Sequence, residues 1–200
     1  WGMIKRLAKE QADAGADLLD INIGISGIDK RTVMAGLFSQ LEQEVNLPLI
    51  IDSGEPEVIE AALQNYSGKA LINSVNGEQK VLDRILPLAL KYGAAVIGLT
   101  LDEKGIPDTA DERVAIAGRI IEEAKKYGIN KENIIIDTLV LTVGSNQEQV
   151  LTAIEALKQV KDRYQVKTTL GISNISHGMP ERELINRTFL TMALGSGLDL

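Results

Sequence analysis

Polar side chains follow several apolar runs of this sequence at the point where each run ends. The stretch TTLGISNISHG changes from apolar to polar just before Asn174. Three other runs, LPLIIDSG, KALINSVNG and ENIIIDTLV, end in the same way at Asp52, Asn73 and Asp137. Asp accepts hydrogen bonds and Asn both accepts and donates them, so these residues suit a neutral heterocycle rich in N–H donors. One polar end of this kind is ordinary, whereas the recurrence predicts a binding site.

Regular alternation of two patterns indicates the elements that position these residues. Helical periodicity covers residues 3–14, 32–46, 55–65, 78–92, 109–128, 147–163 and 183–196. Short apolar, β-branched runs lie between the helices, at residues 17–22, 47–52, 69–74, 94–101, 133–140 and 167–174. Strands of four to eight residues that alternate with longer helices predict βαβ units and a parallel sheet.

Residues at the helix ends support these boundaries. Pro56 falls in the first turn of its helix, where a missing N–H costs nothing. Either Asp108 or Thr109 is suited to cap the helix that follows it. Gly93 and Gly128 each follow a Lys-Tyr pair and predict left-handed helix stops.

Six strands with seven helices fit either an open doubly wound sheet or a (β/α)8 barrel. The chain starts on a helix, and GSGLDL at its end is typical of a strand beginning after a helix. A barrel needs eight strands, so we predict an incomplete (β/α)8 TIM barrel, an α/β fold that lacks its first strand and its last strand–helix unit. Residues 1–200 would form one domain. A complete six-stranded open sheet is the alternative, although no glycine-rich nucleotide motif supports a nucleotide-binding version.

Chemistry in such barrels is carried by residues at the carboxyl ends of the strands. Those ends carry Asp20 and Asn22, Asp52 and Ser53, Asn73 and Asn76, Thr100 and Asp102, Asp137 and Thr138, and Ser173 and Asn174. No Arg or Lys occurs in this set, so it suits phosphate poorly. Some members also have plain structural interpretations. Asp52 and Ser53 could start a helix, Asn76 could cap one, Asp102 fits a solvated loop, and His177 fits the rim.

Composition excludes several classes of function. The net charge is −7 and the basic residues are scattered, so a nucleic-acid binder is disfavoured. The absence of cysteine excludes disulfides and thiolate zinc sites, and one histidine disfavours a histidine-based metal centre, so no bound metal is predicted. No apolar run is long enough to span a membrane, and no signal peptide is evident, which together predict a cytoplasmic protein.

Several of these segments resemble the pterin-binding superfamily of barrels. The resemblance rests on GADLLDINIG, LPLIIDS, KALINSVNGE, IIIDTLVLTV, LGISNIS and LINRTFLTMALGSGLDL, in this order along nearly the whole chain. Within the superfamily, the chain looks most like the methyltetrahydrofolate:corrinoid methyltransferases. The family's usual opening strand is absent, in keeping with an incomplete barrel. Dihydropteroate synthases typically carry an Arg-Lys pair where this chain has Asn174, which argues against a pterin diphosphate substrate.

The resemblance implies a role for each candidate residue. Asp52, Asn73 and Asp137 would hydrogen-bond the pterin ring, and Asn174 would lie beside the methyl-bearing N5. The supporting set would be Asp20 and Asn22 at the pocket floor, Gly171 and Ser173 where the backbone approaches the ligand, and Arg182 near the benzoyl-glutamate tail or the partner protein.

The resemblance also implies the reaction and its participants. A methyl group would move between N5 of (methyl)tetrahydrofolate and the cobalt of a corrinoid, in a direction that the sequence leaves open. N5 must become positively charged for the transfer, and the Asn174 carbonyl could accept a hydrogen bond from protonated N5. The proton itself would come from solvent or through a water chain linked to Asp137. The corrinoid (cobalamin) would be carried by a partner protein or domain, because the chain has no D-x-H-x-x-G motif. A homodimer is also expected. The alternatives are a dihydropteroate synthase-type enzyme and a non-catalytic ligand-binding barrel.

Overall fold

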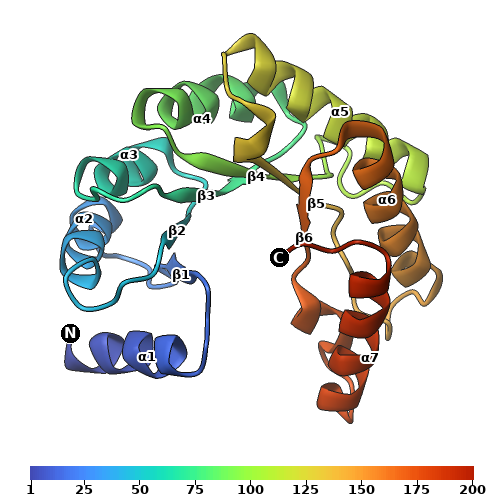
Figure 1. Cartoon of the computed structure of the whole chain (residues 1–200), viewed down its shortest axis with the longest axis horizontal. Coiled ribbons are helices and arrows are strands. Elements are labelled where there is room, and N and C mark those ends of the chain that lie inside the picture. Colours follow the sequence, from blue (N-terminus) through green and yellow to red (C-terminus); the bar gives the residue numbers. More distant parts are fainter. The chain divides into compact units, whose positions relative to one another are not determined.

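The computed structural model describes residues 1–200 and confirms the alternation of strands and helices (Figure 1). The strands are β1 (Leu19–Asn22), β2 (Leu49–Asp52), β3 (Leu71–Val75), β4 (Ala95–Leu99), β5 (Ile134–Asp137) and β6 (Lys167–Thr169). The α-helices are α1 (Gly2–Asp13), α2 (Lys30–Leu41), α3 (Pro56–Gln64), α4 (Gln79–Tyr92), α5 (Ala110–Lys126), α6 (Glu148–Tyr164) and α7 (Arg182–Gly195). Two 3-10 helices, η1 (Lys131–Asn133) and η2 (Ile172–Ser176), precede β5 and follow β6.

All six strands belong to one sheet, in the order β1-β2-β3-β4-β5-β6. The pairs β1–β2, β2–β3 and β5–β6 are parallel. A doubly wound sheet reverses its strand order at a switch point, whereas right-handed crossovers in one direction place every helix on the same face. The consecutive order therefore confirms the TIM-barrel-like α/β fold and excludes the doubly wound alternative.

The chain divides into two compact units. The first unit comprises residues 1–75 and 84–96, and the second comprises residues 76–83 and 97–200. In the first unit, α2 and α3 lie on the same side of β2 and β3 (Figure 1). Phe38 of α2 is fully buried there and meets Tyr66 edge to face, with ring centroids 5.6 Å apart. The expectation of a single domain over residues 1–200 stays a prediction.

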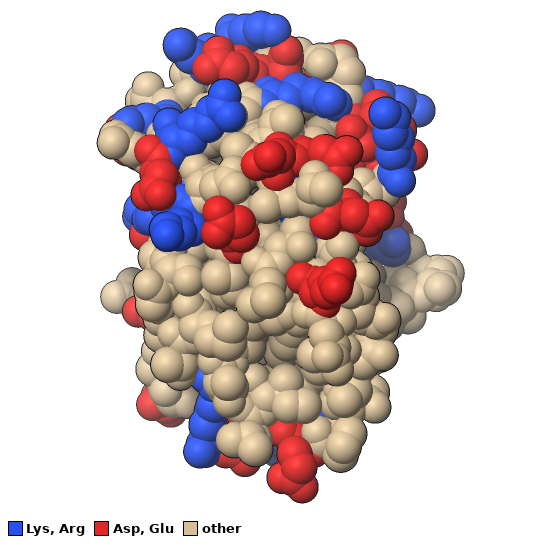
Figure 2. All heavy atoms as spheres, turned by 90° about the vertical axis from the view of Figure 1, so that its right-hand side faces the viewer, with Lys and Arg blue, Asp and Glu red and all other residues tan.

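The second unit has its own apolar core, in which α7 is anchored. Phe189 and Ala193 of α7 pack with Leu157 of α6 and with Leu170 and Ile175 around η2. Charged side chains gather over α5 and α6 on this face, whereas the part over α7 is mostly uncharged (Figure 2). The solvent-exposed apolar side chains of α7 are Leu184, Leu190, Met192 and Leu194.

Helix boundaries agree with the residues that predicted them. Pro56 occupies the first turn of α3, and Thr109 is the cap of α5, where its Oγ1 accepts from the Glu112 N–H at 3.3 Å. Gly93 and Gly128 have φ of 67° and 89°, which confirms the two left-handed stops. None of the helices is long and apolar enough to cross a membrane.

Two predicted strands extended at least three residues beyond the observed carboxyl end, and both differences concern candidate residues. The run 167–174 continues as a strand only to Thr169, and Asn174 lies in η2 instead of at a strand end. Here the Asn174 N–H donates to the Gly171 carbonyl at 3.0 Å, because Gly, Ser and Asn favour turns over further sheet pairing. The run 133–140 ends as a strand at Asp137, where Leu139 takes a left-handed conformation with φ of 58°.

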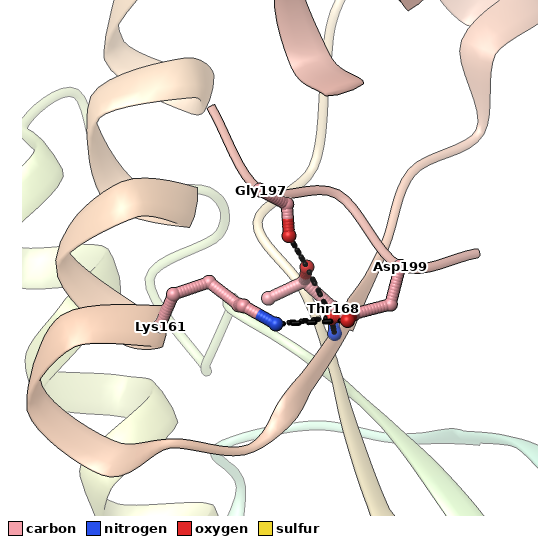
Figure 3. Close-up of polar contacts among 4 residues, drawn as sticks. All are labelled: Lys161, Thr168, Gly197 and Asp199. Carbon is pink, nitrogen blue, oxygen red and sulfur yellow. Dashed lines mark hydrogen bonds and ion pairs between the residues drawn. The ribbon is translucent and has the colours of Figure 1, made fainter. Parts of the chain in front are cut away.

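The last residues of the chain return to the start of β6. The N–H groups of Asp199 and Leu200 both donate to the Thr168 carbonyl, at 3.3 and 3.1 Å. The Asp199 carboxylate accepts from the Thr168 N–H at 2.8 Å and from Lys161 Nζ at 2.7 Å (Figure 3). The segment thus lies where the sequence predicted a further strand to begin, although no strand is formed there.

Replacing Asp199 by asparagine is expected to lower the free energy of unfolding by about 1–2 kcal/mol, because charge-assisted hydrogen bonds are lost. Partial burial acts to raise the pKa of Asp199, but the hydrogen bonds from Lys161 and Thr168 outweigh it and lower that pKa. A lowered pKa stabilises the fold above the unfolded-state value and ceases to do so as the pH falls through the folded-state value. Urea unfolding should therefore show that the variant loses less unfolding free energy, relative to the unsubstituted protein, at pH 3 than at pH 7. Asp162→Asn, an exposed change on α6, is the control, and equal losses in both variants would contradict the role of Asp199.

Candidate functional site

The first unit brings four predicted site residues together at the carboxyl ends of β1, β2 and β3. Register pairs Asn22 with Asp52, and Asp52 with Asn73, so the three lie in one row across the strands. Asn22 Nδ2 donates to Asp52 Oδ2 at 3.0 Å, and Asn73 Nδ2 donates to Asp20 Oδ2 at 3.1 Å. These four candidate residues therefore lie close together within this unit.

Hydrogen bonding inside this row determines what it can offer to a ligand. Each of the two amides directs an N–H at a neighbouring carboxylate, so the amides and carboxylates hold each other in place. The Oδ1 atoms of all four side chains accept no hydrogen bond from the protein. An amide or carboxylate oxygen left free in this way is an acceptor. The row therefore suits a ligand that presents several N–H donors.

Asp20 has an altered acidity in this row. Partial burial raises the pKa of Asp20, and the nearby charge of Asp52 acts in the same direction. The hydrogen bond from Asn73 opposes both effects. Two carboxylates close together resist simultaneous ionisation, and a ligand that donates hydrogen bonds would relieve this repulsion.

One cation approaches the row, contrary to the expectation from the strand ends alone. A cavity of about 170 Å3 is bordered by Asn22, Asp52 and Lys30. Lys30 is the first residue of α2, and its Nζ lies 2.6 Å from Glu55 Oε1. The strand ends contain no Lys or Arg, but the helix that follows β1 supplies one. Lys30 is not apparent from the strand ends alone, because it belongs to the helix that follows β1.

Asp137 lies at the end of β5 in the second unit. Its Oδ1 accepts from the Leu139 N–H at 2.7 Å, and no protein donor reaches its Oδ2. Burial raises the pKa of Asp137 to about 6, against the lowering effects of the Leu139 N–H and the Arg113 charge. An aspartate with this pKa exchanges protons near neutral pH, so it can accept a hydrogen bond when ionised and hold a proton in mild acid.

Asn174 presents a free amide from η2. The residue is exposed, and its side chain has no hydrogen-bond partner in the protein. A Cβ on Gly171 would lie 2.6 Å from Asn174 Nδ2, so the glycine makes room for this amide. We expected Gly171 to let the backbone approach a ligand, and the structure shows that it accommodates the Asn174 side chain. No hydrogen bond links Asn174 to Asp137.

Arg182 braces η2 from the first turn of α7. Its Nη2 donates to the Ser173 carbonyl at 3.1 Å, and its Nε donates to Ser176 Oγ at 3.0 Å. Ser176 Oγ donates in turn to Asn186 Oδ1 at 2.7 Å. A guanidinium therefore contacts the residue next to Asn174, although it comes from the following helix.

The remaining polar strand ends have structural roles. Asn76 Oδ1 accepts from the Glu78 N–H at 2.9 Å, as a turn-forming Asn does. Asp102 Oδ1 accepts from the Lys104 N–H at 3.0 Å, but Asp102 is half-buried and its Oδ2 lies 3.7 Å from Arg119 Nη1, so it is not the solvated loop residue expected. His177 is exposed beside η2, and its backbone carbonyl accepts from Thr142 Oγ1 at 2.8 Å. The outcomes for Asn76 and His177 agree with the plain interpretations of the sequence.

Comparison with known proteins identifies the family. The family model described as pterin binding enzyme matches residues 3–200. The chain belongs to the pterin-binding enzyme family.

Two curated relatives narrow the comparison within the pterin-binding enzymes. Methionine synthase of Mycobacterium tuberculosis is 37% identical over 206 residues, which cover 96% of this chain and 17% of that protein. Methylcorrinoid:tetrahydrofolate methyltransferase of Eubacterium limosum is 31% identical over 199 residues, covering 98% of this chain and 73% of that protein. The chain therefore spans about a sixth of the methionine synthase and nearly three quarters of the methyltransferase.

Solved structures confirm the fold of the pterin-binding enzymes. A dihydropteroate synthase from Yersinia pestis superposes with a TM-score of 0.75 at 16% identity, covering 96% of this chain and 78% of that one. A dihydropteroate synthase from Coxiella burnetii, in complex with pteroic acid, gives 0.74 at 16% identity, covering 96% and 76%. At this identity the likeness concerns the fold alone.

Proposed function

We propose that this pterin-binding enzyme moves a methyl group between N5 of (methyl)tetrahydrofolate and the cobalt of a corrinoid. The methylcorrinoid:tetrahydrofolate methyltransferase supports this assignment, because it is 31% identical over 98% of the chain. The observation that carries the proposal is the unpartnered, exposed amide of Asn174, at the place where a dihydropteroate synthase would carry a cation. An amide can stabilise a charged amine, whereas it cannot neutralise a diphosphate.

We assign part of the binding of the pterin ring to residues of the first unit. Asp52 and Asn73 would accept hydrogen bonds from ring and exocyclic N–H groups with their free oxygens. Asp20 and Asn22 would hold these two side chains in place through the hydrogen bonds already present. Preformed hydrogen bonds of this kind reduce the ordering cost of binding.

In the transfer step, this chain would stabilise charge at N5. The Asn174 carbonyl oxygen would accept a hydrogen bond from protonated N5, and so favour the charged amine from which a methyl group leaves. Asn174 has no ionisable proton, so the proton would arrive from solvent. Asp137 would accept a hydrogen bond from the pterin, and its pKa of about 6 would also let it pass that proton.

The corrinoid supplies the cobalt centre that accepts or donates the methyl group. The chain has no D-x-H-x-x-G motif, so we assign the corrinoid to a partner protein or domain. Arg182, which is exposed beside η2, is a candidate contact for that partner or for the benzoyl-glutamate tail. A homodimer and a cytoplasmic location stay predictions. The exposed apolar side chains of α7 support the prediction of a homodimer.

A second candidate, dihydropteroate synthase-type condensation, is favoured by one observation. The Arg182 guanidinium contacts the Ser173 carbonyl and so places a cation beside Asn174. A cation at that position could stabilise a departing diphosphate. However, the Nε N–H of Arg182 already donates to Ser176 Oγ, and one of its four Nη N–H groups already donates to the Ser173 carbonyl. The side of the guanidinium that includes Nε and Nη2 is therefore occupied within the protein.

Incubation with methyltetrahydrofolate and Co(I) cobalamin should yield methylcobalamin, measured by its absorption spectrum. The reverse reaction, from methylcobalamin to tetrahydrofolate, should be catalysed by the same protein, because one site serves both directions. A parallel incubation with pterin diphosphate and aminobenzoate should give no product. Condensation without methyl transfer would replace the first proposal by the second, and ligand binding without either reaction would indicate a binding protein.

A further inference from the structure

Arg113 is the largest side chain that is fully buried in this protein. It lies in the first turns of α5, and no carboxylate forms an ion pair with it. A buried charge of this kind is costly unless hydrogen bonds compensate for it. Arg113 does not stand out in the sequence, because a helical arginine is ordinarily a solvated residue.

Backbone carbonyls and one amide compensate for the buried charge. Arg113 Nη1 donates to the carbonyls of Thr138 and Leu139, at 2.8 and 2.7 Å. Its Nε donates to the Pro107 carbonyl at 2.9 Å, and its Nη2 donates to Gln149 Oε1. Arg113 thus connects three segments of the second unit, which are the loop at Pro107, the turn that follows β5 and helix α6.

That turn is strained, and it sets the orientation of Asp137. Leu139 has φ of 58°, a conformation that costs a residue with a side chain about 1 kcal/mol. Within the same turn, the Leu139 N–H donates to Asp137 Oδ1 at 2.7 Å, which holds one carboxylate oxygen against the backbone. The two carbonyls held by Arg113 belong to the two residues of this turn, Thr138 and Leu139.

We propose that Arg113 is a positioning residue, which holds the Thr138–Leu139 turn so that the Asp137 carboxylate is aimed at the pterin ligand. The role in ligand binding rests on the proposed function, whereas the orientation and acidity of Asp137 can be tested without it. Gln149 supports the same arrangement, since its Nε2 donates to Asp108 Oδ1 at 3.1 Å while its Oε1 accepts a hydrogen bond from Arg113 Nη2.

Electrostatics support this geometry. Burial raises the pKa of Asp137, and the Leu139 N–H and then the charge of Arg113 lower it. Burial lowers the pKa of Arg113, while Asp108 and Asp137 raise it. Loss of Arg113 would remove both the positive charge and the support of the turn, so both changes would raise the pKa of Asp137.

The experiment compares Arg113→Met and Arg113→Lys with a matched change on the same helix. Arg119→Met is the control, because Arg119 also donates to a backbone carbonyl, that of Gly77 at 2.9 Å, but has no contact with the Asp137 turn. Carbon-13 NMR titration of the Asp137 carboxyl, without ligand, should give a pKa higher by about one unit in Arg113→Met. Arg113→Lys keeps the charge and should give a smaller rise, and the control should match the unsubstituted protein.

Binding of methyltetrahydrofolate gives the second readout. We expect an affinity about tenfold weaker for Arg113→Met and close to normal for Arg119→Met. An unchanged pKa of Asp137 in both Arg113 variants would overturn the inference, and if Arg113→Met does not fold, Arg113→Lys alone decides. Failure of the unsubstituted protein to bind folate would instead contradict the proposed function, while the titration would still test the role of Arg113.

Discussion

Replacing Asn174 by alanine is expected to slow methyl transfer about 100-fold while weakening folate binding only a few-fold. The amide would interact most strongly with N5 when that nitrogen is positively charged, which is the state reached during transfer. The ground-state amine carries no such charge, so binding depends less on Asn174. Single-turnover rates and equilibrium binding of methyltetrahydrofolate, measured on the same preparation, separate the two effects.

His177→Ala is the control for this experiment. His177 follows η2 directly and is exposed, and its side chain has no hydrogen-bond partner in the protein. Its replacement should leave both the rate and the affinity near their normal values. Equal losses of rate and affinity in Asn174→Ala would indicate that the amide only binds the ligand, and the assignment to N5 would be wrong.

Replacing Asp137 by asparagine is expected to weaken folate binding at least tenfold at neutral pH, because an ionised acceptor is lost. The unsubstituted protein should also bind more weakly as the pH falls. Its carboxyl has a pKa of about 6, so the acceptor is ionised at pH 7 and becomes protonated below pH 6. Titration calorimetry between pH 7 and pH 5 should show an affinity that falls by about tenfold.

The Asp137→Asn variant also shows how much of the pH dependence of binding comes from ionisation of the ligand itself. Its affinity should be low and depend less on pH, since position 137 no longer ionises. Asp162→Asn removes one negative charge from the exposed surface of α6 and should bind as the unsubstituted protein does. The role of Asp137 would be contradicted if its asparagine variant kept the normal affinity and the normal pH dependence.

Ionisation of Asp137 also affects the stability of the fold, and its effect on stability changes with pH in the opposite direction to that of Asp199. The pKa of Asp137 is raised, so its contribution to stability is fully present below the unfolded-state pKa and is lost as the pH rises through about 6. The carboxylate therefore destabilises the ligand-free protein at neutral pH. Such a cost is common at binding sites, where groups are placed for a ligand and not for the fold.

Much of the fold and part of the site followed from local sequence pattern. Apolar runs of four to eight residues and amphipathic segments between them predicted every strand and every α-helix, though not the two 3-10 helices, because these periodicities reflect burial directly. Asp20, Asn22, Asp52 and Asn73 were also placed correctly, since a parallel register must align strand ends of similar length. The motifs carried the family assignment, and the match over residues 3–200 confirmed it.

Tertiary structure alone decided the surroundings of the other candidates. Asn174 lies in η2 and not in the expected strand. The residues of GISN favour a turn more strongly than continued pairing with the sheet after Thr169. Arg113 was indistinguishable in sequence from a surface arginine, since its partners are backbone carbonyls 25 and 26 residues away. Local periodicity specifies which residues form strands and helices, whereas contacts with distant backbone groups depend on how those elements pack. The sequence by itself therefore determined the family and the acceptor-rich strand ends, and the packing of α5 against the turn after β5 determined how Asp137 is held.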